Sequence, residues 1–303
     1  MRIAATGATG TIGSALVAEL RARGDEVTAL SRDAARARER LGLEALEWRH
    51  AKAEPPPLDA LRGRDAVVHL LGEYIGQRWS DAAKREIRDS HVLSTRNLVA
   101  GLAELSEGER PRVLVSQSGS GWYGARGAER LDEDEPAGDD FLARVLSEKE
   151  GAARRAAEHG VRVVTTRTGV VLSAEGGALE RMLPFFKLGV GGPVAGGGQY
   201  MPWVHLDDVV GALAFCASTQ AASGPFNVAA PEPPTNAEFS KALGRALRRP
   251  AFLPVPALAL KALYGEMASV VTTGQRAVPD RLQELGYRFR RPDLDEALLG
   301  LLR

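Results

Sequence analysis

Three glycines near the start of the chain have a spacing that can hold a dinucleotide. Gly7, Gly10 and Gly13 form G-x-x-G-x-x-G between an apolar run, Ile3–Thr6, and an amphipathic stretch, Ser14–Arg23. Glycines here permit a sharp turn, let the backbone approach a pyrophosphate and allow close helix packing. The N–H groups and positive end of the helix then attract phosphate. We predict that the phosphates contact Gly7, Thr9, Gly10, Thr11, Ile12 and Gly13; the alternative is a glycine-rich turn without a ligand.

The end of the next apolar run selects between the two nicotinamide dinucleotides. NAD-binding proteins usually place Asp or Glu about 20 residues beyond the glycines, where the carboxylate holds the ribose 2′-OH. This chain has Ser31 and Arg32 there, and Asp33 should point away. A guanidinium can form charge-assisted hydrogen bonds to a 2′-phosphate, worth about 1.5–3 kcal/mol, or roughly 10- to 150-fold in affinity. We therefore predict that the cofactor is NADP(H), with contacts from Ser31 and Arg32.

A parallel sheet is needed to position these residues. The first half of the chain alternates apolar runs with amphipathic stretches, which is typical of βαβ units. The predicted strands are Ile3–Thr6, Glu26–Leu30, Ala66–Leu71, Val113–Ser116, Val161–Arg167 and Pro225–Ala229. The predicted helices are Ser14–Arg23, Asp81–Glu104 and Phe141–His159, with another that starts near Asp207. The predicted fold class is α/β, a Rossmann doubly wound parallel sheet with a smaller, mostly helical C-terminal lobe.

The alternation of apolar runs and amphipathic stretches ends near residue 170. A glycine-rich loop, Gly189–Gly198, follows, and the sequence after Pro231 is helical and interrupted by prolines. We predict an NADP(H)-binding domain over residues 1–170, to which 206–230 returns, and a substrate lobe made of 171–205 and 231–303. The loop could bind an anion through its backbone N–H groups. A mobile lid hinge is the preferred interpretation.

Composition argues against several classes of function. The 39 Lys and Arg balance the 39 Asp and Glu, so no net charge favours nucleic acid or an anionic membrane. Cys216 is the single cysteine, and the histidines at 50, 69, 91, 159 and 205 have no metal-ligand spacing. Neither a signal peptide nor a bilayer-spanning run is recognised. We expect a cytoplasmic protein without a metal that acts on a small molecule.

Longer stretches of the chain resemble a known family. Thr6–Gly13, Val113–Gly124 and Val163–Val171 are similar to extended short-chain dehydrogenase/reductases of the NAD-dependent epimerase/dehydratase superfamily. More narrowly, Ser116–Gly124 and Trp203–Asp208 resemble an atypical epimerase-family subgroup often labelled nucleoside-diphosphate sugar epimerase. The resemblance implies an oxidoreductase or epimerase that acts on a small carbonyl or sugar-like compound. It extends the cofactor site to Leu70, Leu71, Gly72, His91, Ser116, Thr168, Gly169 and Val170.

The acid/base pair usual in that superfamily is missing from the sequence. There a helix carries Tyr-x-x-x-Lys, in which the tyrosine moves a proton and the lysine lowers its pKa. None of the tyrosines at 74, 123, 200, 264 and 287 has lysine four residues later. Counted back from the Arg167 strand, the pair should fall near Phe141 and Val145, which cannot move a proton. Either other groups act, or the chain is a catalytically silent NADPH-sensing regulatory or scaffold protein.

Two residues could replace the missing pair. The resemblance places Ser118 where the superfamily has a substrate-polarising Ser or Thr, although a serine that satisfies local backbone is the alternative. Tyr123 could present its phenol to the pocket or be a structural aromatic in a turn. His91 stands where the superfamily has an asparagine near the nicotinamide, and an exposed helix histidine is the simpler interpretation. Asp207 and Asp208 are expected at a helix start.

The substrate is expected over the carboxyl ends of the strands, where doubly wound sheets bind ligands. The residues predicted to contact it are Glu73, Tyr74, Arg78, Met182, Phe186 and Trp203. Related folds commonly dimerise through long helices such as Asp81–Glu104 and Phe141–His159. By analogy a homodimer can form here too.

Overall fold

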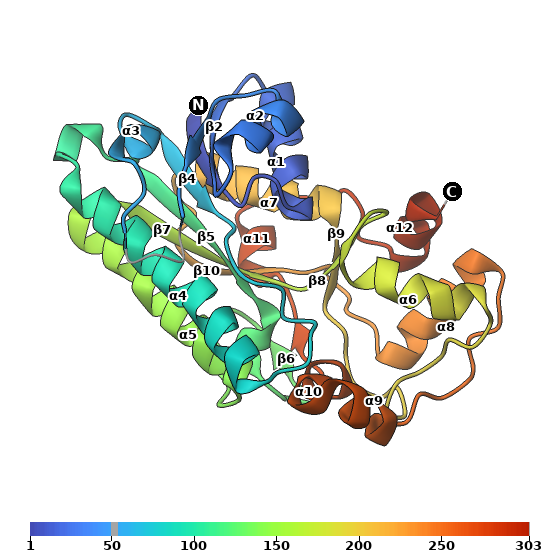
Figure 1. The fold of residues 1–303 in the computed structure, drawn as a ribbon. Helices are drawn as coiled ribbons and strands as arrows, with labels where there is room; N and C mark the ends of the chain where they lie inside the picture. The colour runs from blue at the N-terminus through green and yellow to red at the C-terminus, as the bar shows by residue number, and fades with distance from the viewer. Residues whose placement is uncertain (50–53, 303) are drawn as a thin grey trace.

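The computed structural model describes residues 1–49 and 54–302, so His50 of the histidine pattern lies outside the described residues. Its centre is a parallel seven-stranded sheet with the order β10-β7-β5-β4-β1-β2-β3 (Figure 1). The strands are β1 (Arg2–Thr6), β2 (Glu26–Ser31), β3 (Ala45–Glu47), β4 (Ala66–His69), β5 (Val113–Gly119), β7 (Arg162–Thr168) and β10 (Gly224–Val228). The predicted doubly wound parallel sheet is confirmed.

Helices cover both faces of this sheet, which is why its strands are almost continuously apolar. Successive side chains of a strand point to opposite faces. In β1, Ile3 and Ala5 therefore pack with α1 (Thr11–Ala22) and α7 (Leu206–Ser218). Ala4 instead belongs to the apolar cluster under α4 (Asp81–Glu104). Figure 1 shows α4 and α5 (Phe141–Arg154) side by side on that second face.

The sequence predictions place the elements well and their ends less well. The helix Asp81–Glu104 has the predicted bounds, whereas Phe141–His159 divides into α5 and a 3-10 helix, Arg155–His159. The edge strand β3 was not predicted, because three residues are too few to show a period. Two short helices, α2 (Ala34–Leu41) and α3 (Leu58–Leu61), complete the first half.

The C-terminal helices gather at one end of the sheet (Figure 1). They are α6 (Gly177–Lys187), α8 (Asn236–Leu247), α9 (Ala257–Tyr264), α10 (Ala268–Thr272) and α12 (Leu294–Leu301), whereas α11 (Asp280–Glu284) packs beside β10 of the main sheet. Trp203, Phe239 and Leu298 are at the centre of the apolar cluster in this lobe. Two small parallel sheets join distant segments: β8 (Val170–Leu172) with β9 (Trp203–His205), and β6 (Arg130–Leu131) with β11 (Arg276–Ala277).

The start of α7 attaches the C-terminal segment to the sheet. The helix begins at Leu206, and His205 caps it by accepting a hydrogen bond at Nδ1 from the Asp207 N–H, at 3.0 Å. Asp208 is fully buried and accepts hydrogen bonds from the backbone N–H groups of Arg290 and Arg291, at 2.6 and 2.9 Å. The expected helix start at this acidic pair is present. Among the described residues, none forms a helix both long and apolar enough to cross a membrane.

Candidate cofactor and active site

The N-terminus of α1 is built to receive an anion. Gly7 has φ +67°, a left-handed conformation that favours glycine, and begins the turn after β1. A Cβ on Gly13 would lie 2.2 Å from the Gly7 carbonyl oxygen, so only glycine lets the helix approach the loop this closely. Within the described chain, no side chain caps α1, and its first turn has no acidic residue. The first N–H groups of α1 therefore remain available to a phosphate.

The Gly7–Gly13 turn lies in the crevice at the point where the strand order of the sheet reverses. The chain passes from β1 to β2 on one side, while β4 is the neighbour of β1 on the other. A Cβ on Gly7 would touch Leu70 at 3.2 Å, and Thr6 Oγ1 accepts a hydrogen bond from the Leu70 N–H at 3.1 Å. Doubly wound sheets bind ligands at such a switch point. Gly176, just before α6, also approaches Thr11, so the C-terminal lobe borders the same crevice.

The end of β2 presents an unpaired cation. Arg32 is exposed and makes no ion pair with any part of the chain that the structure describes. The neighbouring Asp33 carboxylate caps α2 by accepting a hydrogen bond from the Arg36 N–H, at 2.9 Å. That carboxylate is therefore occupied within its own helix. The side of the crevice that would face an adenosine ribose thus offers a free guanidinium.

A buried lysine lies near the carboxyl end of β4. Lys149, on α5, is 2% exposed, and its ammonium donates a hydrogen bond to the Leu71 carbonyl at 2.8 Å. Burial lowers the pKa of Lys149 to about 7. Four residues earlier on the same helix is Val145, which is buried. The helix face that meets the crevice thus carries residues 145 and 149, one turn later than Phe141 and Val145, so the register of the expected pair was wrong.

His91 lies against this lysine and is not the exposed helix histidine of the simpler interpretation. Its Nδ1 is 3.5 Å from the Lys149 Nζ, and its Nε2 is buried without a hydrogen-bond partner among the described residues. A Cβ on Gly72 would lie 2.2 Å from the His91 ring. Burial and the charge of Lys149 lower the pKa of His91 to about 3, so the imidazole is neutral.

Ser118 is placed at the same end of the sheet but has no local partner. It is 7% exposed, lies in β5 and stands opposite Arg167 of β7. Its Oγ is buried, and no described residue forms a hydrogen bond with it. The interpretation as a serine that satisfies nearby backbone is therefore wrong. A buried hydroxyl without a partner is uncommon and costly, which makes a ligand group its natural partner.

Tyr123 belongs to a different environment, and the expectation that its phenol faces the pocket is corrected. Its ring is fully buried, and its hydroxyl lies 2.7 Å from Asn227 Oδ1 and 2.8 Å from the Asp132 carbonyl. The hydroxyl also accepts a hydrogen bond from Arg167 at 3.1 Å. Burial raises the pKa of Tyr123 to about 12. These contacts occupy the hydroxyl inside the fold.

Arg167 is the centre of this buried network. Its Nε and Nη2 donate to the two carboxylate oxygens of Glu150, at 3.1 and 3.2 Å, and both side chains are under 5% exposed. Its guanidinium also stacks over the Trp122 ring, 4.0 Å from the centroid. Glu133 completes the network by accepting a hydrogen bond from the Asn227 N–H at 2.9 Å. We call Tyr123, Glu133, Glu150, Arg167 and Asn227 the Arg167 cluster.

The residues expected to contact substrate separate into two groups. Trp203 is fully buried and Phe186 is 6% exposed, so both belong to the core of the C-terminal lobe and the expected direct contact is corrected. Met182 packs against the same core. Tyr74 is 43% exposed, and Arg78 donates to the Ala262 and Leu263 carbonyls of α9, at 2.9 and 3.2 Å. Glu73 is held by its N–H, which donates to Ser90 Oγ at 2.8 Å.

The strand ends predicted to border the cofactor are close-packed. Ser116 is 1% exposed, and Thr168 is 7% exposed. A Cβ on Gly169 would lie 2.3 Å from the Pro202 carbonyl oxygen, and the Val170 N–H donates to the same oxygen at 2.6 Å. These contacts fix the passage from the main sheet into β8.

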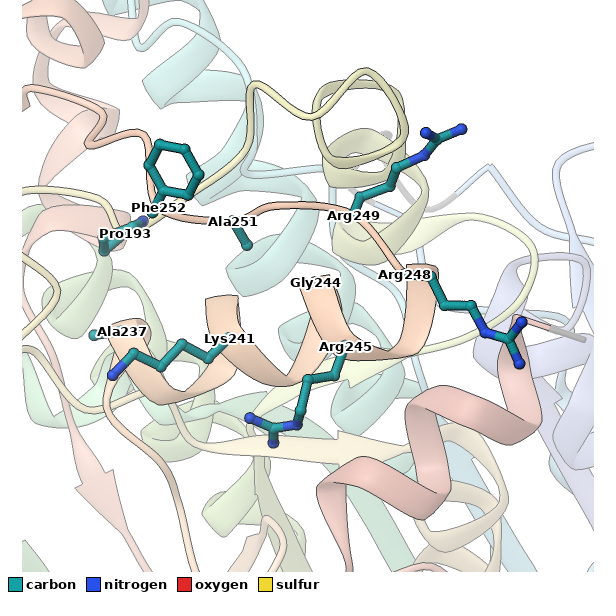
Figure 2. A pocket seen from close by; sticks show the side chains of 9 residues that line it. All are labelled: Pro193, Ala237, Lys241, Gly244, Arg245, Arg248, Arg249, Ala251 and Phe252. Carbon is teal, nitrogen blue, oxygen red and sulfur yellow. The ribbon is translucent and has the colours of Figure 1, made fainter.

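A groove lies beside α8 in the C-terminal lobe (Figure 2). It has a volume of about 590 Å³ and lies between α8 and the segment that follows that helix. Its lining residues are Pro193, Ala237, Lys241, Gly244, Arg245, Arg248, Arg249, Ala251 and Phe252. Figure 2 shows that the basic side chains point in different directions. None of the residues predicted to bind cofactor or substrate lines this groove.

The comparisons with known proteins identify the family. Residues 3–229 match the model of the NAD dependent epimerase/dehydratase family, and residues 255–300 match a domain of unknown function, DUF1731. The chain belongs to the NAD-dependent epimerase/dehydratase family.

Relatives resemble the chain over nearly its whole length. An epimerase family protein of Mycobacterium bovis is 42% identical over 298 residues, which cover 98% of this chain and 96% of the relative. A chloroplastic epimerase family protein of Arabidopsis thaliana is 38% identical, covering 100% of this chain and 87% of the relative. The crystal structure of human epimerase family protein SDR39U1 with NADPH has a TM-score of 0.88 and 34% identity, and covers 100% and 99% of the two chains.

Proposed function

We propose that the protein is an NADP(H)-dependent oxidoreductase or epimerase that acts on a small carbonyl or sugar-like compound. The observation that carries the proposal is the uncapped N-terminus of α1, which the Gly7–Gly13 turn places in the crevice beside β4. Its first-turn N–H groups would hold the diphosphate of the cofactor. The human relative crystallised with NADPH supports the same cofactor here.

The free guanidinium of Arg32 supports NADP(H) over NAD(H). A carboxylate at this place would repel a 2′-phosphate, and the nearby Asp33 carboxylate is already occupied by the α2 cap. An exposed, unpaired arginine can instead bind a phosphate through two N–H groups. We infer a contribution of about 1.5–3 kcal/mol to the preference for the phosphorylated cofactor.

Ser118 is the residue that we propose polarises the substrate. When bound, the nicotinamide supplies or accepts a hydride. Ser118 Oγ has no hydrogen-bond partner among the described residues and can donate a hydrogen bond to the substrate oxygen, where negative charge develops as the hydride is transferred. Tyr123 has no part in this step, because its hydroxyl is bound within the Arg167 cluster.

Calorimetry with NADPH and NADH tests the cofactor proposal. NADPH should bind roughly 10- to 150-fold more tightly than NADH, and Arg32→Glu should abolish or invert the difference. Arg40→Glu is a matched control, because Arg40 is also exposed on this edge but lies at the last turn of α2. Equal dissociation constants in the unsubstituted protein, or no binding of either dinucleotide, would contradict the proposal.

A catalytically silent NADPH sensor is the second candidate. It is favoured by Val145, which occupies the helix position four residues before Lys149, where a tyrosine could have moved a proton. A screen of carbonyl compounds for NADPH oxidation separates the two functions, with Ser118→Ala as the control. Turnover that Ser118→Ala reduces supports the enzyme. NADPH binding without turnover, together with NADPH-dependent capture of a protein partner, supports the sensor.

A further inference from the structure

Two nitrogen-bearing side chains meet between α4 and α5 near the carboxyl end of β4. Lys149 of α5 and His91 of α4 approach to 3.5 Å between Nζ and Nδ1. Lys149 is also held by the Leu71 carbonyl at 2.8 Å, and Gly72 packs directly against the His91 ring. Leu70, the residue before Leu71, touches the phosphate turn at Gly7. The pair therefore borders the crevice in which we place the cofactor.

The chemistry of the two groups fixes the direction of their hydrogen bond. A lysine ammonium has three donors and no acceptor, so the neutral imidazole must accept at Nδ1. Its single proton then lies on Nε2. That Nε2 is buried and has no partner in the described part of the chain. The imidazole thus accepts a hydrogen bond at Nδ1. Its Nε2–H makes no hydrogen bond of normal geometry with the described residues, although the Glu73 backbone lies close enough to raise the His91 pKa slightly against the effect of burial.

We propose that Lys149 and His91 form a proton relay that replaces the missing tyrosine, an inference that rests on the proposed NADP(H)-dependent reaction. In the reduction direction, the substrate carbon gains the hydride that the nicotinamide supplies. The substrate oxygen gains the proton of His91 Nε2, while Lys149 gives a proton to His91 Nδ1. The substrate becomes an alcohol and Lys149 becomes a neutral amine. The relay is restored when the His91 Nδ1 proton returns to Lys149 and His91 Nε2 takes a proton from solvent.

The surroundings allow Lys149 to change its charge near neutral pH. Burial lowers its pKa to about 7, and the neighbouring Glu150 acts in the opposite direction. Glu150 is itself paired with Arg167, so it is not a free counter-ion for the lysine. The other charged groups between these helices, Arg88 and Glu148, form a partly exposed ion pair with each other at 2.6 Å. Within the part of the chain that the structure describes, Lys149 therefore has no carboxylate partner of its own.

Nitrogen NMR of histidine-labelled protein tests the arrangement of the relay without any substrate. With NADPH bound, His91 should be neutral from pH 5 to 9 and protonated at Nε2. Its Nδ1 signal should shift with an inflection near pH 7 as Lys149 loses its proton. Lys149→Met should remove that inflection. A His91 that titrates with an ordinary pKa near 6.5, or one protonated at Nδ1, would overturn the relay.

Kinetics with a panel of aldehydes, diketones and quinones tests its function. NADPH oxidation should slow above pH 7, and Lys149→Met and His91→Phe should each lower kcat by roughly 10²- to 10⁴-fold while NADPH still binds. Lys149→Arg should be nearly as slow as Lys149→Met, because a guanidinium keeps its proton. Arg88→Gln, a control outside the relay, should keep the original kcat and pH profile.

The outcomes separate the relay from the proposed function. Unchanged kcat and pH profile in Lys149→Met, or no oxidation of any compound by protein saturated with NADPH, would overturn the relay while leaving cofactor binding intact. Failure of the unsubstituted protein to bind NADPH would overturn the proposed function and, with it, the relay.

Discussion

The Arg167 cluster and the crevice both contain buried polar groups, but they differ in whether those groups have hydrogen-bond partners within the fold. In the cluster, the Tyr123 hydroxyl, the Arg167 guanidinium and the Glu133 carboxylate all have partners inside the fold. In the crevice, Ser118 Oγ and His91 Nε2 have none among the described residues. Trp122, Thr166 and Trp203 also have a buried polar atom without a partner in the described residues, so a missing partner alone does not indicate a ligand. At Ser118 and His91 the missing partner coincides with a place at the crevice, which is why we assign these two to a ligand.

The α1 N-terminus extends the same comparison to the backbone. Ser80, Asp140 and Thr235 cap α4, α5 and α8 with hydrogen bonds from their side chains. In contrast, α1 begins at Thr11, and no side chain of the described residues caps it, because its N-cap residue is Gly10. In a capped helix, a side chain accepts hydrogen bonds from the first backbone N–H groups. In an uncapped helix, these N–H groups can bind a phosphate instead.

Replacing Arg167 should have the largest effect on stability, because it removes the central side chain of the Arg167 cluster. Arg167→Met leaves Glu150 buried without its partner, which should lower the free energy of unfolding by about 3–5 kcal/mol, measured by denaturant titration. The double variant Arg167→Met, Glu150→Met should recover part of the loss. A loss below about 1 kcal/mol would show that the pair does not behave as a buried one.

Glu133 gives the cluster a pH dependence. Burial raises the pKa of this carboxyl to about 7, although it accepts hydrogen bonds from the Asn227 and Arg281 N–H groups. The folded state then binds the proton more tightly than the unfolded state. The stabilisation is therefore full below pH about 4.5 and is lost as the pH rises through about 7.

The size of this effect can be isolated by comparing the protein with Glu133→Gln over that range. A shift of this size corresponds to on the order of 3 kcal/mol, and the difference in unfolding free energy between the two proteins should change by that amount between pH 4.5 and 8. A constant difference would mean that Glu133 is ionised throughout, as its N–H donors would favour.

In the crevice, a methyl group on Gly13 should disturb the phosphate turn. A Cβ there would lie 2.2 Å from the Gly7 carbonyl oxygen, so the loop must move. Gly13→Ala should weaken NADPH binding at least about tenfold, or about 1.4 kcal/mol, by calorimetry. Gly151→Ala on α5 meets open space and should leave affinity unchanged while stabilising the helix by roughly 0.5–1 kcal/mol. Equal affinities in both variants would contradict the assignment.

Ser118→Ala should have the smallest effect on stability. Because Ser118 Oγ has no partner in the described residues, its removal should leave the free energy of unfolding unchanged or raise it by up to about 1 kcal/mol. Ser90 is the control: its Oγ accepts from the Glu73 N–H and donates to the Ile87 carbonyl, at 2.8 and 2.9 Å. Ser90→Ala should cost about 1 kcal/mol. A similar loss of unfolding free energy in Ser118→Ala would show that the Ser118 hydroxyl is hydrogen-bonded within the fold.

The sequence was sufficient for the fold because its signals are local. Apolar runs predicted six of the seven strands of the main sheet, and the glycine spacing predicted the turn before α1. The position of Lys149 could also have been found, since it is the only lysine between residues 141 and 159 and Val145 is four residues before it. Counting from the next strand missed it by one helical turn, because the connection between a helix and a strand has no fixed length.

The amino-acid sequence by itself determined the doubly wound sheet and the phosphate turn, since periodicity and glycine spacing depend on neighbouring residues. Only the tertiary structure decided which polar side chains have hydrogen-bond partners inside the fold. Tyr123 and Asn227 are 104 residues apart, and Lys149 and His91 are 58 apart. Whether such groups pair depends on how the strands and helices pack, because a hydrogen bond forms only when separate elements bring donor and acceptor within about 3 Å.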